Sequence, residues 1–168
     1  MCQICGIASE TKSHAILVYP LQFISMDVFF AKYQGRTRNF LITVNHYSDF
    51  FELDLWSDLT MHTLINTCKR NFSRHGNPQR VLTDNRTNFV NGAMTAFSKE
   101  WDFEHVTSTP YHQQANGKAE VAVKIAKRII NKAEESRRDI WLMLLNWRNT
   151  PNKMGSSPVA RLFSRSTR

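Results

Sequence analysis

Three apolar runs stand near the start of the chain, at residues 23–30, 40–44 and 50–55. They are rich in β-branched and aromatic residues, and the segments KYQGRTRN and NHYSD between them have compositions typical of turns. Short runs of this kind, bounded by turn-forming residues, are typical of β-strands. The pattern predicts three neighbouring strands that pair antiparallel.

The spacing of apolar residues then becomes helical, from residue 59 to residue 72. Ser57 or Asp58 is placed to cap this helix, and Gly76 and Pro78 end it. The next elements alternate: RVLT predicts a buried strand, GAMTAFSKEW a short helix and FEHVTS another strand. Alternation of strands and helices implies parallel pairing in this half of the sheet.

Two amphipathic helices complete the pattern. The first begins at Lys118 and carries an apolar stripe as far as Ala133, and the second runs from Ile140 toward Pro151. We therefore predict an α/β fold with a five-stranded mixed sheet, in the element order β-β-β-α-β-α-β-α-α. Its helices should cover both faces of the sheet.

Length and composition indicate one folded core with short flanks. A chain of 168 residues suffices for one hydrophobic core and is short for two. We place the core at residues 20–150. Residues 1–19 lack a sustained period and should form an N-terminal arm, and residues 151–168, rich in Ser, Arg, Gly and Pro, an extended basic C-terminal tail.

The charge of the chain points to a polyanionic partner. A formal net charge of +8 and a pI near 9.7 attract nucleic acid, although the same charge also serves solubility alone. Three cysteines give an odd count and no disulfide framework, which favours the reducing cell interior. The most apolar early stretch is interrupted by Pro20, Gln22 and Asp27, so we expect no membrane span.

Three carboxylates are prominent because of their positions. Asp27 interrupts the first apolar run, Asp84 directly follows RVLT, and Glu120 starts the long helix. Each has a purely structural explanation. Asp27 could face solvent on one side of its strand, and Asp84 could close a side-chain turn. Glu120 could complement the helix dipole or pair with Lys124.

The predicted topology favours a shared role for these acids. In open α/β sheets the ends of adjacent central strands meet at one crevice, so Asp27 and Asp84 would face each other if the first and fourth strands are neighbours. A helix that starts nearby would add Glu120. Carboxylates this close repel one another, and a hard cation such as Mg²⁺ relieves the repulsion. Two such ions suit an in-line phosphoryl displacement.

Several motifs resemble the catalytic core of retroviral and gypsy-type retrotransposon integrases. They are MDVFF, VLTDNRTNFV and STPYHQQANGKAE, with further likeness in HYSDFFELD, KAEVAVKIAKR and WRNTP followed by GSSP. Thirty-five residues lie between Asp84 and Glu120, which is the interval of the family's D,D-35-E signature. The resemblance covers roughly residues 20–165 and implies a ribonuclease H-like fold.

The resemblance also implies the roles of the site residues. Asp27, Asp84 and Glu120 would be the catalytic residues and would bind Mg²⁺ or Mn²⁺, as two ions. A DNA 3′-hydroxyl or water would attack a phosphodiester, with no small-molecule cofactor. The partners would be DNA, both element ends and target, and further copies of the chain in a dimer or larger homo-oligomer. The residues expected to contact DNA are Tyr111, Gln114, Asn116, Lys124 and Lys127.

The chain departs from the family pattern at several positions. Arg86 stands where the family usually has Gly, and Gln113 where it usually has Pro. Cys2 and Cys5 resemble the last half of the family's zinc module, but two ligands do not close a tetrahedral zinc site. We expect Cys68 to be an ordinary core residue.

Three functions are therefore considered. The first is a metal-dependent DNA strand-transfer enzyme that is intracellular and acts in the nucleus on chromosomal DNA. The second is a non-catalytic or host-recruited DNA-binding or oligomerisation module derived from such an integrase. The third is a general ribonuclease H-type nuclease, which shares the fold and the metals but not the Tyr-Gln-Gly loop.

Overall fold

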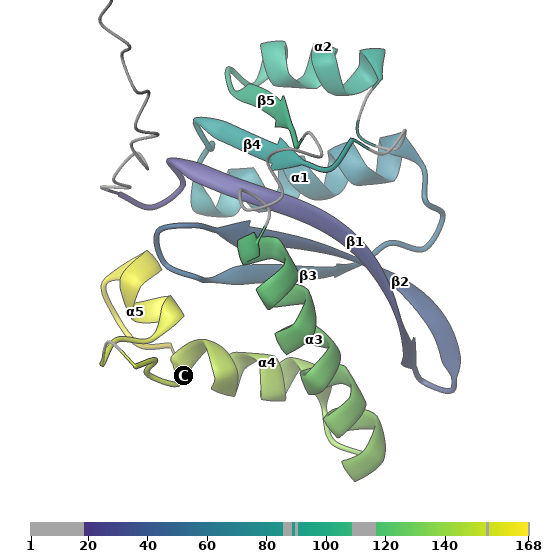
Figure 1. The fold of residues 1–168 in the computed structure, drawn as a ribbon, viewed down its shortest axis with the longest axis vertical. Helices are drawn as coiled ribbons and strands as arrows, with labels where there is room; N and C mark the ends of the chain where they lie inside the picture. The colour runs from purple at the N-terminus through teal and green to yellow at the C-terminus, as the bar shows by residue number, and fades with distance from the viewer. Residues whose placement is uncertain (1–18, 86–88, 90, 109–116, 154, 168) are drawn as a thin grey trace, which may run out of the picture.

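A five-stranded sheet forms the centre of the molecule (Figure 1). The computed structural model describes residues 19–85, 89, 91–108, 117–153 and 155–167. The sheet has the order β3-β2-β1-β4-β5, in which β1 pairs antiparallel with β2 and parallel with β4. This confirms the predicted mixed sheet, and it meets the condition set above that the first and fourth strands are neighbours. The strands are β1 (Phe23–Tyr33), β2 (Arg36–Asn45), β3 (Phe51–Leu55), β4 (Arg80–Thr83) and β5 (Glu104–Thr107).

Helices cover both faces of the sheet, as predicted (Figure 1). One face packs against α1 and α2, the other against α3 and α4, and α5 lies beside α4. No helix in the described part of the chain is long and apolar enough to cross a membrane. The helices are α1 (Met61–His75), α2 (Gly92–Glu100), α3 (Gly117–Ser136), α4 (Ile140–Asn149) and α5 (Pro158–Phe163).

The alternation of side chains along the strands divides the apolar core into two clusters. On β2, Phe40 and Ile42 pack toward α3 and α4, while Leu41 packs toward α1. All three are at most 1% exposed. Cys68 is a core residue on the α1 side, as expected, and burial raises the pKa of its thiol to about 12. Such a buried thiol is unreactive at neutral pH.

The first hairpin is longer than its sequence suggests. The predicted eight-residue turn KYQGRTRN contains a turn of only two residues, Gln34 and Gly35, with φ values of 53° and 72°. Positive φ at both positions is what a two-residue hairpin requires. The remaining residues of this segment extend β1 and β2 to the margin of the core, where Tyr33 still packs on the core while Lys32 and Arg36 are exposed. The backbone N–H of Gln34 donates to Glu134 Oε1 at 2.9 Å, which ties the hairpin tip to α3.

The cap of α1 also differs from the prediction. Thr60, not Ser57 or Asp58, is the N-cap residue, and its hydroxyl accepts from Thr63 N at 3.2 Å. Asp58 supports this cap from outside the helix, because its carboxylate accepts from Thr60 N and from the Thr63 hydroxyl. The helix therefore starts later than the apolar pattern alone indicated.

The C-terminal segment is not extended, which corrects the expectation for residues 151–168. Ser157 caps α5 by accepting from Ala160 N at 3.2 Å, and Pro158 occupies the first turn. Val159 is 1% exposed. A Ser–Pro pair is a recognised start signal for a helix, but six residues are too few to show a helical period.

Candidate active site

Asp27 lies in β1, and Asp84 directly follows β4, the strand that pairs parallel with β1. β1 and β4 pair as far as Ser25 and Leu82, and each aspartate comes two residues later in the chain. Side chains two apart along a strand point to the same face, so the Asp27 carboxylate continues the face of Ser25. Phe29 on that face of β1 packs against α3. The sheet thus puts Asp27 on the α3 face of β1, and Asp84 follows the end of the neighbouring strand.

Glu120 stands in the first turn of α3 and is exposed. α3 packs on the sheet through Ala122 and Ala126, so its first turn lies on the same face as Asp27. Among the residues that the structure describes, no group of three or more His, Cys, Asp or Glu side chains is close enough to hold a metal ion. The role of Glu120 as the third ligand stays a prediction.

The donors that the fold does bring together suit a hard divalent cation. Asp27 and Asp84 are both partly buried and offer only oxygen ligands. Mg²⁺ prefers such oxygens and retains several water or phosphate ligands, so it does not need a complete protein cage. Val28 N donates a hydrogen bond of 2.7 Å to Asp27 Oδ1, and this bond fixes the orientation of the Asp27 carboxylate. The residues present therefore fit the predicted Mg²⁺.

A turn between β2 and β3, residues 46–50, contacts both β1 and α3. His46 Nε2 and the hydroxyl of Ser25 in β1 are 2.9 Å apart. From α3, the Lys118 ammonium donates to the backbone oxygen of His46 at 2.6 Å and to the Asp49 carboxylate at 2.5 Å. The turn therefore links the first half of β1 to the first turn of α3.

These contacts position the two elements that carry acids. Ser25 precedes Asp27 by two residues, and Lys118 precedes Glu120 by two. Burial, with the positive charge of Lys118 as a second cause, lowers the pKa of His46 to about 4. The His46 ring is neutral at pH 7, so it holds Ser25 without adding a charge to the site.

The C-terminal helix supports the same turn. Arg161 in α5 donates to Asp49 Oδ2 at 2.9 Å and also to the backbone oxygen of Tyr47. Asp49 therefore accepts from α3 and from α5 at once. The segment predicted as an extended tail is part of the scaffold of the site.

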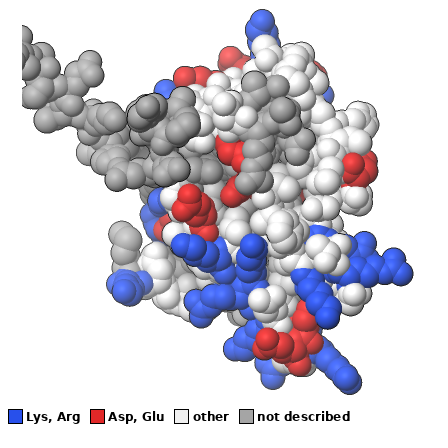
Figure 2. Space-filling model, turned by 45° about the vertical axis from the view of Figure 1, so that its right-hand side comes forward, with Lys and Arg blue, Asp and Glu red and all other residues white. Residues whose placement is uncertain are grey.

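Basic side chains line the exposed surface of α3. Lys124 and Lys127, both expected to contact DNA, are exposed, as are Arg128 and Lys132. Within the described chain, neither Lys124 nor Lys127 forms an ion pair, so the alternative pairing of Glu120 with Lys124 is not observed. Figure 2 shows Lys and Arg gathered over the lower part of this face, with acidic side chains above them and a further acidic group near the bottom. This distribution suits a phosphate backbone that approaches an acidic site.

Other predicted residues lie outside the described part of the chain. These are the expected DNA contacts Tyr111, Gln114 and Asn116, the two substituted positions Arg86 and Gln113, and the cysteines Cys2 and Cys5. Their roles stay predictions.

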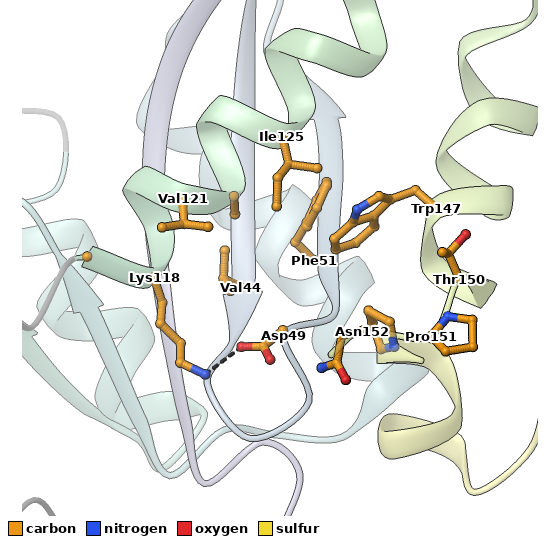
Figure 3. Close-up of a pocket in the computed structure, with 13 residues that line it drawn as sticks. Val44, Asp49, Phe51, Lys118, Val121, Ile125, Trp147, Thr150, Pro151 and Asn152 are labelled. Atoms are coloured by element: carbon orange, nitrogen blue, oxygen red, sulfur yellow. Dashed lines mark hydrogen bonds and ion pairs between the residues drawn. The ribbon is translucent and has the colours of Figure 1, made fainter. Parts of the chain in front are cut away.

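A cavity of about 620 Å³ opens beneath the first turns of α3 (Figure 3). Its walls are mostly apolar, with Phe51 and Trp147 facing Val121 and Ile125. The Lys118–Asp49 ion pair lies at one side (Figure 3). None of the three predicted acids lines this cavity, so it is separate from the predicted chemistry.

Comparison with known families agrees with the geometry. The profile of the Integrase core domain family matches residues 18–113. The chain belongs to this family. It is 29% identical over 134 residues to an uncharacterized protein of Caenorhabditis elegans, covering 76% of this chain and 11% of that protein. It is 26% identical over 111 residues to the Gag-Pro-Pol polyprotein of mouse mammary tumor virus, and this match covers 66% of this chain and 6% of that polyprotein. This integrase core thus spans a small part of these relatives.

Solved structures share the fold. The HTLV-2 integrase catalytic core domain in complex with magnesium, in its trimeric form, has a TM-score of 0.71 at 20% identity, covering 86% of this chain and 98% of that one. The simian T-cell lymphotropic virus intasome in complex with PP2A regulatory subunit B56 gamma has a TM-score of 0.77 at 15% identity. The match covers 89% of this chain and 57% of that one. These likenesses confirm the ribonuclease H-like fold of the integrase core.

Sequence reasoning missed the residues that support the site. His46 and Asp49 stand in NHYSD, which the pattern marked only as a turn. Arg161 stands in the segment expected to be extended. Their partners are more than 20 residues away along the chain, so no local sequence pattern predicts these contacts. An ion pair between a turn and a helix start becomes visible only in three dimensions.

Proposed function

We propose that this integrase core catalyses metal-dependent DNA 3′-end processing and strand transfer. The observation that supports this best is that Asp27 and Asp84 both follow the paired part of two adjacent parallel strands, β1 and β4, by two residues in an integrase core fold. Asp27, Asp84 and Glu120 would hold Mg²⁺ or Mn²⁺, in two sites. Bound there, the ions would stabilise the attacking and leaving oxygens of an in-line displacement at phosphorus.

The protein's own residues would supply orientation and charge. Asp27 is held by its hydrogen bond from Val28 N, and the β2–β3 turn fixes β1 relative to α3. Lys124 and Lys127 would neutralise backbone phosphates near the acids, which lowers the cost of bringing DNA to a carboxylate cluster. Positioning of this kind contributes much of the rate in reactions that need no covalent protein intermediate.

The test uses the complete chain with Mg²⁺ or Mn²⁺ and oligonucleotides that carry pre-processed or branched ends. We expect joined or trimmed DNA products from the wild type and at least 100-fold less from Asp27→Asn. Equal amounts of product from both proteins would contradict the proposal.

A second candidate is a DNA-binding or oligomerising module without catalysis. It is favoured by Arg86, which follows Asp84 and Asn85 where the family usually has Gly, and by the exposed position of Glu120. This module would bind DNA in a salt-dependent way with no change in the Asp27→Asn variant. Metal-dependent product that disappears in that variant would exclude it.

The partners and the location follow from the same function. We propose that the chain acts on element ends and target DNA in the nucleus, as a dimer or larger homo-oligomer. Trp141 and Leu142, 45% and 56% exposed on α4, offer an apolar surface for self-association. Light scattering of the purified chain tests the self-association. The measurement is made at about 100 μM, a concentration on the order of that at which weak interfaces form. A monomer at this concentration would contradict the proposed oligomer.

A further inference from the structure

The end of β4 depends on β5 for its support. β4 pairs with β1 only as far as Leu82, whereas it pairs with β5 through its last residue, Thr83, which lies opposite Thr107. The backbone oxygen of Thr83 also accepts from Ser108 N at 2.8 Å. Asp84 is the next residue in the chain. The position of this predicted site residue therefore depends on how firmly β5 holds Thr83.

One side-chain contact joins the two strands at this point. His105 Nε2 in β5 and the hydroxyl oxygen of Thr83 are 2.9 Å apart. Thr83 is fully buried, at 0% exposure, and within the described part of the chain His105 is the partner of its hydroxyl. A buried hydroxyl that loses its partner costs free energy, so this contact favours one position of Thr83.

The contact lies on the face of the sheet away from α3. Val81, two residues before Thr83, belongs to the core cluster that packs against α1 and α2, and Thr83 points to the same face. Ser25 in β1 is held on the other face, by His46 at 2.9 Å. Each of the two neighbouring strands is thus tied by a histidine shortly before its aspartate, from opposite faces of the sheet.

His105 suits this place because its ring is neutral. Burial lowers the pKa of His105 below its usual value, so the ring carries no charge at pH 7. A neutral ring holds the hydroxyl without placing a positive charge near the carboxylate of Asp84. A lysine or arginine in the same place would add a charge that repels a metal cation.

We propose that His105 is a positioning residue for Asp84. Through the Thr83 hydroxyl it fixes the end of β4, and thereby the place of the aspartate that would hold Mg²⁺ or Mn²⁺. Residues behind a metal ligand keep that ligand oriented, so their removal weakens metal binding although they do not touch the ion. This inference rests on the proposed metal-dependent function and names a residue of β5 that sets the metal affinity of the site.

The experiment measures the Mn²⁺ affinity of the complete chain without DNA, from the electron paramagnetic resonance signal of free Mn²⁺. Thr83→Val keeps the shape of the side chain but removes the hydroxyl, and His105→Leu removes the ring nitrogen. We expect each variant to bind Mn²⁺ more weakly, on the order of 10-fold. The double variant should be no weaker than either single variant, because both changes remove the same contact. His105→Gln, which retains a hydrogen-bonding end, should recover most of the affinity.

His62→Leu is the matched control, because it removes an exposed histidine from α1. It should not change the Mn²⁺ affinity. Unchanged affinity in Thr83→Val and His105→Leu, or losses that add up in the double variant, would overturn the positioning role. A wild type that binds no Mn²⁺ would overturn this role together with the metal site. Mn²⁺ binding that depends on His105, in a chain that yields no DNA product, would contradict the proposed function and leave the positioning role standing.

Discussion

At the scale of single residues, a substitution at Asp27 should lower activity strongly without lowering stability. Replacing it with Asn removes a proposed metal ligand but keeps the volume and the hydrogen bond from Val28 N. Asn is uncharged, so the variant has no charge to bury at this partly buried position. We expect Asp27→Asn to lose at least 100-fold in DNA joining while its thermal midpoint stays equal or rises.

The control for this change is Asp102→Asn, the same charge change at an exposed position after α2. Its left-handed backbone, with φ of 50°, is one that Asn adopts readily. Asp102→Asn should keep full activity. A lower melting temperature for Asp27→Asn, large enough to account for its lost activity, would mean that Asp27 is structural.

Two buried titratable residues predict how stability depends on pH. The pKa of Glu52 falls to about 2: burial opposes ionisation, but His75 and Arg148 hold the charged form at 2.6 and 2.7 Å. The pKa of His46 falls to about 4 through burial. For both residues the pKa in the folded protein lies below the pKa in the unfolded chain, so each group favours the folded state at higher pH. That stability is lost as the pH falls, for His46 between about 6.5 and 4 and for Glu52 between about 4.5 and 2.

Urea denaturation midpoints from pH 8 to pH 3 check this prediction. Glu52→Gln should be less stable than the wild type at pH 7, on the order of 3 kcal/mol. The difference should shrink below pH 4.5. His46→Gln should flatten the curve between pH 6.5 and 4. Parallel curves for all three proteins would show that these groups do not govern the acid sensitivity.

At the scale of elements, the contact between the β2–β3 turn and α3 should control the geometry of the site. Lys118→Met keeps the length of the side chain but loses the bonds to His46 and Asp49. Because the pair with Asp49 is about two-fifths exposed, we expect less than about 1 kcal/mol of lost stability. Displacing Glu120 by about 1 Å would cost up to 100-fold in rate. The expected result is a lower kcat with nearly unchanged KM.

Lys132→Met is the comparison, since it removes an exposed lysine from the same helix. It should preserve kcat, and Lys118→Arg should restore part of the loss. If Lys118→Met and Lys132→Met behave alike, the turn does not position Glu120.

The sequence allowed the elements to be predicted where burial imposes a period. Short runs of β-branched and aromatic residues identified the strands around Phe40 and Ile42, and the apolar stripe identified α3. The same logic failed where burial stops: Lys32 and Arg36 belong to strands that extend to the margin of the core. It failed again at α5, which is too short for a period. Asp84 and Glu120 were singled out by their places after RVLT and at the start of the long helix, and the family interval of 35 residues then linked them.

At the scale of the whole molecule, the net charge of +8 is unevenly distributed with respect to the acids. Lys and Arg gather over the region of α3, next to an acidic border (Figure 2). DNA binding by such a surface releases counterions, with a slope of about 0.9 in log affinity against log salt for each phosphate neutralised. The slope therefore counts the lysines that contact the backbone.

Lys124→Ala with Lys127→Ala should reduce that slope by about 2. Lys69→Ala with Lys99→Ala removes the same charge from α1 and α2, across the sheet, and should leave the slope unchanged. Asp27→Asn should also leave it unchanged, because a site acid contacts no phosphate except through a cation. The measurement is the affinity for one blunt duplex between 50 and 300 mM salt, about the range in which such slopes are linear. The slopes of the variants are then compared with that of the wild type. Equal slopes for the two double variants would show that the lysines of α3 form only a solvated helix face, and DNA would then lie elsewhere on the molecule.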